Sequence, residues 1–196
     1  MSRRYLFIPA VLIAALFPLA GCGGGGNSDE DQITDAITTS ATTNTDSNCT
    51  ELQTQRFLEQ IEFATGAEAV KECKSSGPDS NADSVEVSNI EVDGDTATAD
   101  AAITGAAFNG QTLTIALVKE GDQWKLDHID AFVDFDQQAL AQAFAENVQQ
   151  GSDPGTPAQA KCVQDKINAA PANIVQTAVL SGNSQAFGAL FGTCFQ

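Results

Sequence analysis

Apolar and polar residues alternate with a period of two over much of residues 84–133, which predicts β-strands. Short turn sequences divide this region into four runs, so the pattern predicts a four-stranded antiparallel meander. The turns are Asp93-Gly94-Asp95, Asn109-Gly110 and Gly121-Asp122. Within the first run the apolar parity changes between Val87 and Ile90, which predicts a β-bulge near Ser88 or Asn89.

Helical spacing of apolar residues is found on both sides of this region. Residues 50–73 predict two helices with a break at Gly66, and a further helix is expected from Asp136 to about Val148. Residues 157–194 predict two or three short helices. We therefore expect an α+β fold, with helices packed on a curled four-stranded antiparallel sheet and a small C-terminal helical segment closed by a disulfide.

The first 21 residues have the pattern of an export signal. Arg3 and Arg4 precede an apolar stretch that is too short for a permanent membrane span. The stretch ends in Leu19-Ala20-Gly21-Cys22, which resembles the lipobox of bacterial lipoproteins. The resemblance implies acylation of Cys22 and an extracytoplasmic protein anchored by lipid to a bacterial membrane. An ordinary secretory signal is the alternative.

The residues after Cys22 are mostly polar or glycine. Residues 22–48 contain few apolar side chains, so we expect them to form a flexible tether. The sheet and its neighbouring helices predict one domain over residues 49–149, followed by a C-terminal helical appendage over residues 150–196.

Four cysteines remain after Cys22 is set aside, and an exported protein meets oxidising conditions. Three pairings are possible. We favour Cys49–Cys73 and Cys162–Cys194, because each pair brackets one predicted helical unit. A zinc site is the competing interpretation, but the sequence has no C-x-x-C spacing and its only histidine is His128.

The chain is strongly acidic, with a net charge of −17. The signal segment holds two of the nine basic residues and none of the 26 acidic ones, so the mature chain carries −19. Such a charge repels phosphate backbones, which argues against nucleic acid as a partner. Anionic lipid head groups are not expected to bind the domain either.

The stretches Val87–Ile103 and Ala116–Ile129 resemble the nuclear-transport-factor-2-like superfamily, as do the helices that precede them. Within it the chain is most similar to small bacterial lipoproteins that carry such domains. The resemblance covers about residues 50–133 and implies a cone of sheet wrapped on helices, with Trp124 in the core. It also implies a concave pocket, which the superfamily uses in enzymes, in ligand-binding proteins and in interaction modules, so the fold does not settle the function.

Strict alternation along the last strand would place one set of side chains in that pocket. Together with two residues of the first helices, the expected lining is Phe57, Ile61, Trp124, Leu126, His128, Asp130 and Phe132. His128 beside Asp130 would suit acid–base catalysis. The mature chain has no tyrosine, however, and superfamily enzymes commonly use one to polarise a carbonyl.

Other chemistry receives little support. The segment 79–84 begins like a calcium loop, but Ser84 stands where the turn requires glycine and Ile90 where the bidentate glutamate belongs. No G-x-S-x-G motif is present, and each cysteine has a structural or lipid assignment. No cofactor or metal is therefore expected.

The preferred hypothesis is an envelope lipoprotein without catalytic activity that binds a small apolar ligand or an envelope partner. Two alternatives remain. An enzyme would place His128 and Asp130 together in a dry pocket. A pure interaction module would have a filled cone and an exposed apolar patch.

Overall fold

The computed structural model describes residues 28–43, 45–75, 81–150 and 154–195. Its centre is one antiparallel sheet in the strand order β1-β2-β3-β4, as the alternating pattern predicts. The strands are β1 (Ser84–Asp93), β2 (Thr96–Thr104), β3 (Thr112–Glu120) and β4 (Gln123–Asp134). The α+β fold class is thereby confirmed. Among the described residues, no helix has the length and hydropathy that a membrane span requires.

Irregularities in two strands curl the sheet. In β1 the register shifts between Ser88 and Glu91, and Asn89 has a positive φ of 50°, so the predicted bulge is confirmed. In β4 the register shifts three times against β3. The residues of β4 without a partner on β3 are Asp127, Asp130 and Val133.

The bulges of β4 change which side chains face inward. Leu126, Ile129 and Phe132 all pack in or against the core under the sheet, although they are three residues apart rather than two. Each bulge adds one residue to the strand, and this extra residue reverses the alternation. As a result, every third residue of this part of β4 faces the core.

Helix α1 (Asp29–Thr42) lies within the segment expected to be a tether, so that prediction is wrong for residues 29–42. Ser28 and Asp31 form a reciprocal capping box that starts the helix. Ile33, Ala36 and Ile37 have helical spacing and are buried against the concave face of the sheet. Two isoleucines and an alanine are thus enough to hold this otherwise polar helix in place, because the sheet supplies the rest of the core.

The first turn of α1 is fixed to the far end of the β3–β4 hairpin. The Asp29 Oδ1 atom accepts hydrogen bonds from Lys119 Nζ at 2.7 Å and from Trp124 Nε1 at 3.0 Å. These two hydrogen bonds lower the pKa of Asp29. Trp124 itself is only 1% exposed, so the expectation that it lies in the core is confirmed.

Three short helices follow where two were predicted: α2 (Asn48–Glu51), α3 (Gln55–Glu62) and α4 (Ala67–Ser75). The Cys49–Cys73 disulfide joins α2 to α4, as expected. Between α2 and α3 the chain pairs with the open edge of β4: Leu126 N donates to Leu52 O, and Thr54 N donates to Leu126 O, both at 2.9 Å. This contact fixes α3 beside the sheet.

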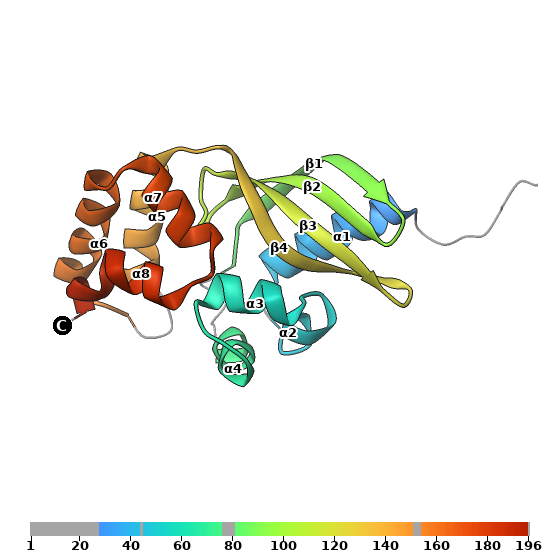
Figure 1. Ribbon diagram of the computed structural model, residues 1–196, viewed down its shortest axis with the longest axis horizontal. Coiled ribbons are helices and arrows are strands. Elements are labelled where there is room, and N and C mark those ends of the chain that lie inside the picture. The colour runs from blue at the N-terminus through green and yellow to red at the C-terminus, as the bar shows by residue number, and fades with distance from the viewer. Residues whose placement is uncertain (1–27, 44, 76–80, 151–153, 196) are drawn as a thin grey trace, which may run out of the picture.

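The C-terminal helices form a second unit, on the left in Figure 1. It contains α5 (Gln137–Gln150), α6 (Pro157–Ala169), α7 (Ala172–Leu180), α8 (Ser184–Phe191) and the short 3-10 helix η2 (Gly192–Phe195). The expected Cys162–Cys194 disulfide closes it. Because Leu140 and Phe144 of α5 pack in the core of this unit, it begins near residue 137 rather than at the predicted residue 150.

Gln60, a buried side chain of α3, joins the two units. Its Nε2 donates to Ile129 O at 2.9 Å and to Leu180 O at 2.6 Å, and its Oε1 accepts from Ile129 N at 2.6 Å. The chain leaves α7 through Gly182, where φ is +59° and an added Cβ would lie 2.5 Å from Gln60 Cα. Only glycine therefore allows this approach.

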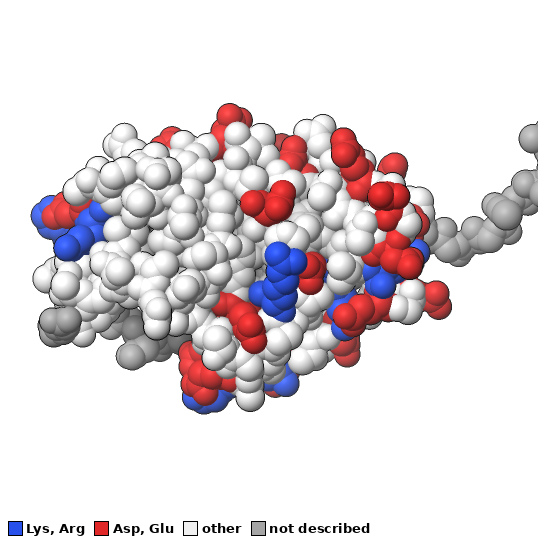
Figure 2. Space-filling view, viewed as in Figure 1, with Lys and Arg blue, Asp and Glu red and all other residues white. Residues whose placement is uncertain are grey.

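Charge is distributed unevenly between the units. Residues 28–136 hold 23 acidic and five basic residues. Residues 137–196 hold only three acidic and two basic residues. In Figure 2 the acidic side chains accordingly gather over the sheet and the first helices, and the C-terminal helices are largely uncharged.

Candidate functional site

A cavity of about 300 Å³ lies on the concave side of the sheet. Its wall is contributed by α1, α3, all four strands and the turn before β3, and it reaches Asn147 of α5. The wall is mostly apolar, and its larger side chains include Ile37, Phe57, Ile61, Leu113, Leu126 and Ile129. This volume is at the lower end of the range for small-molecule sites, so the space under the sheet is large enough for a small ligand.

The alanines of β2 explain why space remains under the sheet. Ala97, Ala99 and Ala101 point inward and are at most 5% exposed. All three belong to the core that includes Ile33 and Ile37 of α1, and Ala101 also lines the cavity. Their small side chains therefore let α1 approach the sheet and also leave space beside it.

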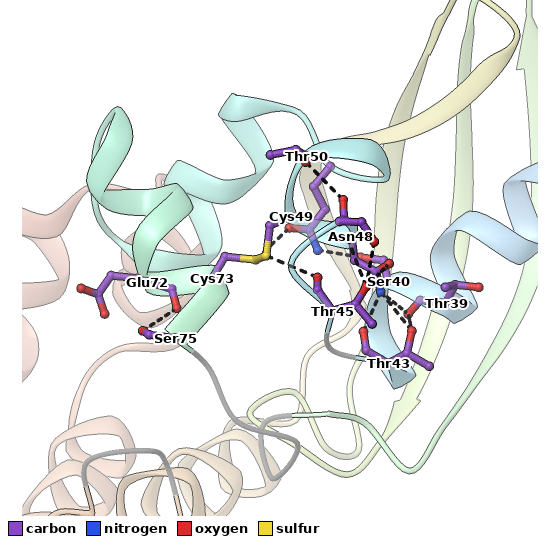
Figure 3. The surroundings of a disulfide bond; sticks show 12 residues. Thr39, Ser40, Thr43, Thr45, Asn48, Cys49, Thr50, Glu72, Cys73 and Ser75 are labelled. Carbon is purple, nitrogen blue, oxygen red and sulfur yellow. Dashed lines mark hydrogen bonds between the residues drawn. A yellow bond between two sulfur atoms is a disulfide. The ribbon is translucent and has the colours of Figure 1, made fainter.

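A polar section of the wall is held by the Cys49–Cys73 disulfide, and both cysteines line the cavity. Figure 3 shows the disulfide and the polar side chains around it. The Asn48 side chain donates to Thr43 O at 2.8 Å and thereby ties α2 to the end of α1. Gln53 is only 7% exposed, and its Nε2 donates to Ser40 Oγ at 2.7 Å. These hydrogen bonds and the disulfide join α1, α2 and α4 along this part of the wall.

Glu62 is the one ionisable side chain in the wall, among the residues that the structure describes. Burial, and secondarily the nearby carboxylate of Glu72, raise the pKa of Glu62 to about 7. The carboxyl group is therefore about half protonated at neutral pH. The sequence pattern does not predict Glu62 as a wall residue, because a glutamate at the end of an amphipathic helix normally faces solvent.

The structure brings three of the seven predicted lining residues to the cavity: Phe57, Ile61 and Leu126. Trp124 lies deeper in the core toward the hairpin end, where it bonds Asp29. Phe132 packs between the two units, with its ring 4.9 Å from that of Phe135. The prediction that these two aromatic residues line the cavity is wrong, although both contribute to the cores.

His128 and Asp130 do not line the cavity either, and the bulges in β4 are the reason. The extra residue at Asp127 turns His128 away from the concave face and brings Ile129 to the cavity instead. Strict alternation places Ile129 on the outer face of the strand, so it was not predicted to line the cavity. In the sequence, only the spacing of three residues between the apolar Leu126 and Ile129 indicates a shared face.

Around His128 the charged side chains form a surface network. His128 Nδ1 lies 3.0 Å from Asp127 Oδ2, but its Nε2 is 3.6 Å from Asp130 Oδ1, which is too long for a hydrogen bond. Asp127 also accepts from Arg56 Nη1 at 2.9 Å and from Thr54 Oγ1 at 3.1 Å. The network ties α3 to β4 and presents no base to the cavity.

Comparison with known proteins gives no relative: no family model, no curated protein and no solved structure matches this chain.

Proposed function

We propose that the protein is a lipid-anchored protein of a bacterial envelope whose cavity holds a small apolar ligand without chemically changing it. The export signal and the lipobox resemblance support the anchor, although both lie outside the described residues. The two disulfides support an oxidising, extracytoplasmic compartment.

The start of α1 shortens the proposed link to the membrane. Six peptide steps separate Cys22 from Ser28, which caps α1, so the link spans at most about 20 Å. Asp29 contacts the end of the β3–β4 hairpin, so this end of the domain would lie nearer the membrane than the C-terminal helices do (Figure 1).

Replacement of Cys22 by serine tests the anchor. We expect the wild-type protein to incorporate radioactive palmitate in a bacterial host and to fractionate with membranes. The Cys22→Ser variant, which lacks the acceptor sulfur, should lose both properties. Equal labelling of the two proteins would contradict the proposed lipid anchor.

One observation carries the ligand-binding proposal, namely the largely apolar cavity of about 300 Å³ that is already formed in the folded chain. Apolar walls with a few fixed polar groups are typical of small-molecule sites. A pure interaction module would instead have a filled cone. The enzyme alternative required His128 and Asp130 inside the cavity, and neither lines it.

Filling the cavity tests this proposal. Ala101 lines the cavity, whereas the next residue, Ala102, faces the other side of β2. We expect the neutral dye N-phenyl-1-naphthylamine to bind the wild-type protein with saturable fluorescence. Ala101→Leu should weaken binding at least tenfold because the larger side chain occupies the ligand's space.

Ala102→Leu is the matched control and should bind the dye as the wild-type protein does. If the wild-type protein fails to bind any apolar probe, or if both variants bind equally well, the cavity is not a binding site. Urea unfolding of each protein shows whether a loss of binding reflects a loss of folding.

A further inference from the structure

Resting on the proposed function, we infer that the cavity selects ligands whose polar end is an amine or a hydroxyl group, and that it rejects carboxylates with the same apolar body. The chemical class is an aliphatic amine or alcohol of about the size of a ten-carbon chain. Glu62 is the residue that makes the distinction.

The position of Glu62 gives this side of the cavity a negative potential. Glu62 is the last residue of α3, and the following residue, Phe63, ends the helix in a left-handed conformation with a φ of 51°. The carbonyl groups at the C-terminus of a helix carry a partial negative charge, which adds to that of the carboxylate. Both features favour a cationic or hydrogen-donating group.

Nothing in the described part of the wall offsets this potential. Lysine and arginine are absent from it, and its other polar side chains are neutral: Ser40, Thr43, Asn48, Gln53, Asn81 and Asn147. Glu62 is half-buried and has no hydrogen bond or ion pair with another described residue. An ammonium or hydroxyl group of a ligand would supply the missing partner, whereas a carboxylate would lie unpaired beside a second one.

The charged groups around Glu62 make this selectivity depend on pH. Glu72 of α4 opposes ionisation of Glu62, and Lys71 lies 3.9 Å from Glu72 and 2.8 Å from Glu68. The pKa of Glu62 is raised to about 7, so the carboxyl group becomes charged as the pH rises through neutrality. Amine binding should therefore strengthen by about tenfold between pH 5.5 and pH 8.

Displacement of N-phenyl-1-naphthylamine by decylamine, decanol and decanoate tests the inference, because the three probes share one alkyl chain. At pH 8 we expect the order decylamine, decanol, decanoate, with at least tenfold between the first and the last. Glu62→Gln should abolish the advantage of decylamine over decanol and its pH dependence. Glu59→Gln, on the same helix but outside the cavity wall, should leave both unchanged.

The outcomes separate this inference from the proposal on which it rests. If the dye and decanol bind but decanoate binds as tightly as decylamine, the selectivity is overturned and the ligand site stands. The same holds if Glu62→Gln leaves the order unchanged. If no probe binds the wild-type protein, the ligand site and the selectivity are both overturned. The pH series on the wild-type protein needs no variant, so misfolding of Glu62→Gln cannot obscure the result.

Discussion

Replacing Cys162 and Cys194 together by alanine should lower the free energy of unfolding by about 3–4 kcal/mol, because the bridge closes a loop with a sequence separation of 32 residues. The loop runs from the middle of α6 through α7 and α8, so the disulfide restricts the unfolded state of most of the C-terminal unit. A unit of this size has a small core and depends strongly on such a constraint.

As the urea concentration rises, the C-terminal unit of the double variant should unfold before the sheet does. Trp124 is the only tryptophan and lies in the core under the sheet, so its fluorescence reports the sheet, whereas circular dichroism at 222 nm reports all helices. In the double variant we expect the circular dichroism transition in urea to occur at lower concentration than the fluorescence transition. Coincident and unshifted transitions would contradict the assigned role of this bridge.

The matched comparison is the double alanine variant of Cys49 and Cys73, which have a sequence separation of 24 residues. The expected loss is similar, about 3.5 kcal/mol. Here the fluorescence transition should move as well, because α3 lies inside the loop and its Phe57 packs in the core under the sheet with Trp124. The two bridges therefore differ in the part of the molecule that they stabilise.

Gln60→Leu should be the most damaging single polar substitution, with a loss of about 3 kcal/mol. The change leaves the amide and carbonyl of Ile129 and the carbonyl of Leu180 without their side-chain partner in a buried place. Each buried polar group left unpaired costs about 1–3 kcal/mol, and relaxation recovers part of the sum. Urea unfolding measures the loss.

Gln142→Leu is the control for this substitution. Gln142 is exposed on α5 and hydrogen bonds only Glu146 among the described residues, so we expect a change within about 0.5 kcal/mol. Hydrogen exchange of the Ile129 amide should accelerate in Gln60→Leu and not in Gln142→Leu. Equal stabilities of the two variants would show that Gln60 does not join the units.

The sequence was sufficient for elements whose pattern is local. Alternation with short turns predicted the meander, and the change of parity after Val87 placed the bulge of β1. The cysteine pairs followed from the helical units that they bracket. In each case the determining interaction lies within a few residues or within one predicted unit.

The elements that were missed depend on partners far away in the chain. Helix α1 has only three buried residues, and its stability comes from the concave face of the sheet. The bulges of β4 follow from pairing with β3 and contact with α3, so strict alternation wrongly placed His128 and Asp130 inside the cone. Glu62 lines the cavity because α3 packs against the sheet, and the local sequence around Glu62 does not indicate this packing.

Native mass spectrometry with decanol tests the central claim most directly, because it counts ligands on the folded chain. The Cys22→Ser protein, which lacks the proposed lipid and is otherwise unchanged, should carry one decanol at saturation. Ala101→Leu on the same background should carry none, and Ala102→Leu should carry one. Absence of a bound molecule on the first protein, or the same occupancy on all three, would contradict a ligand site under the sheet.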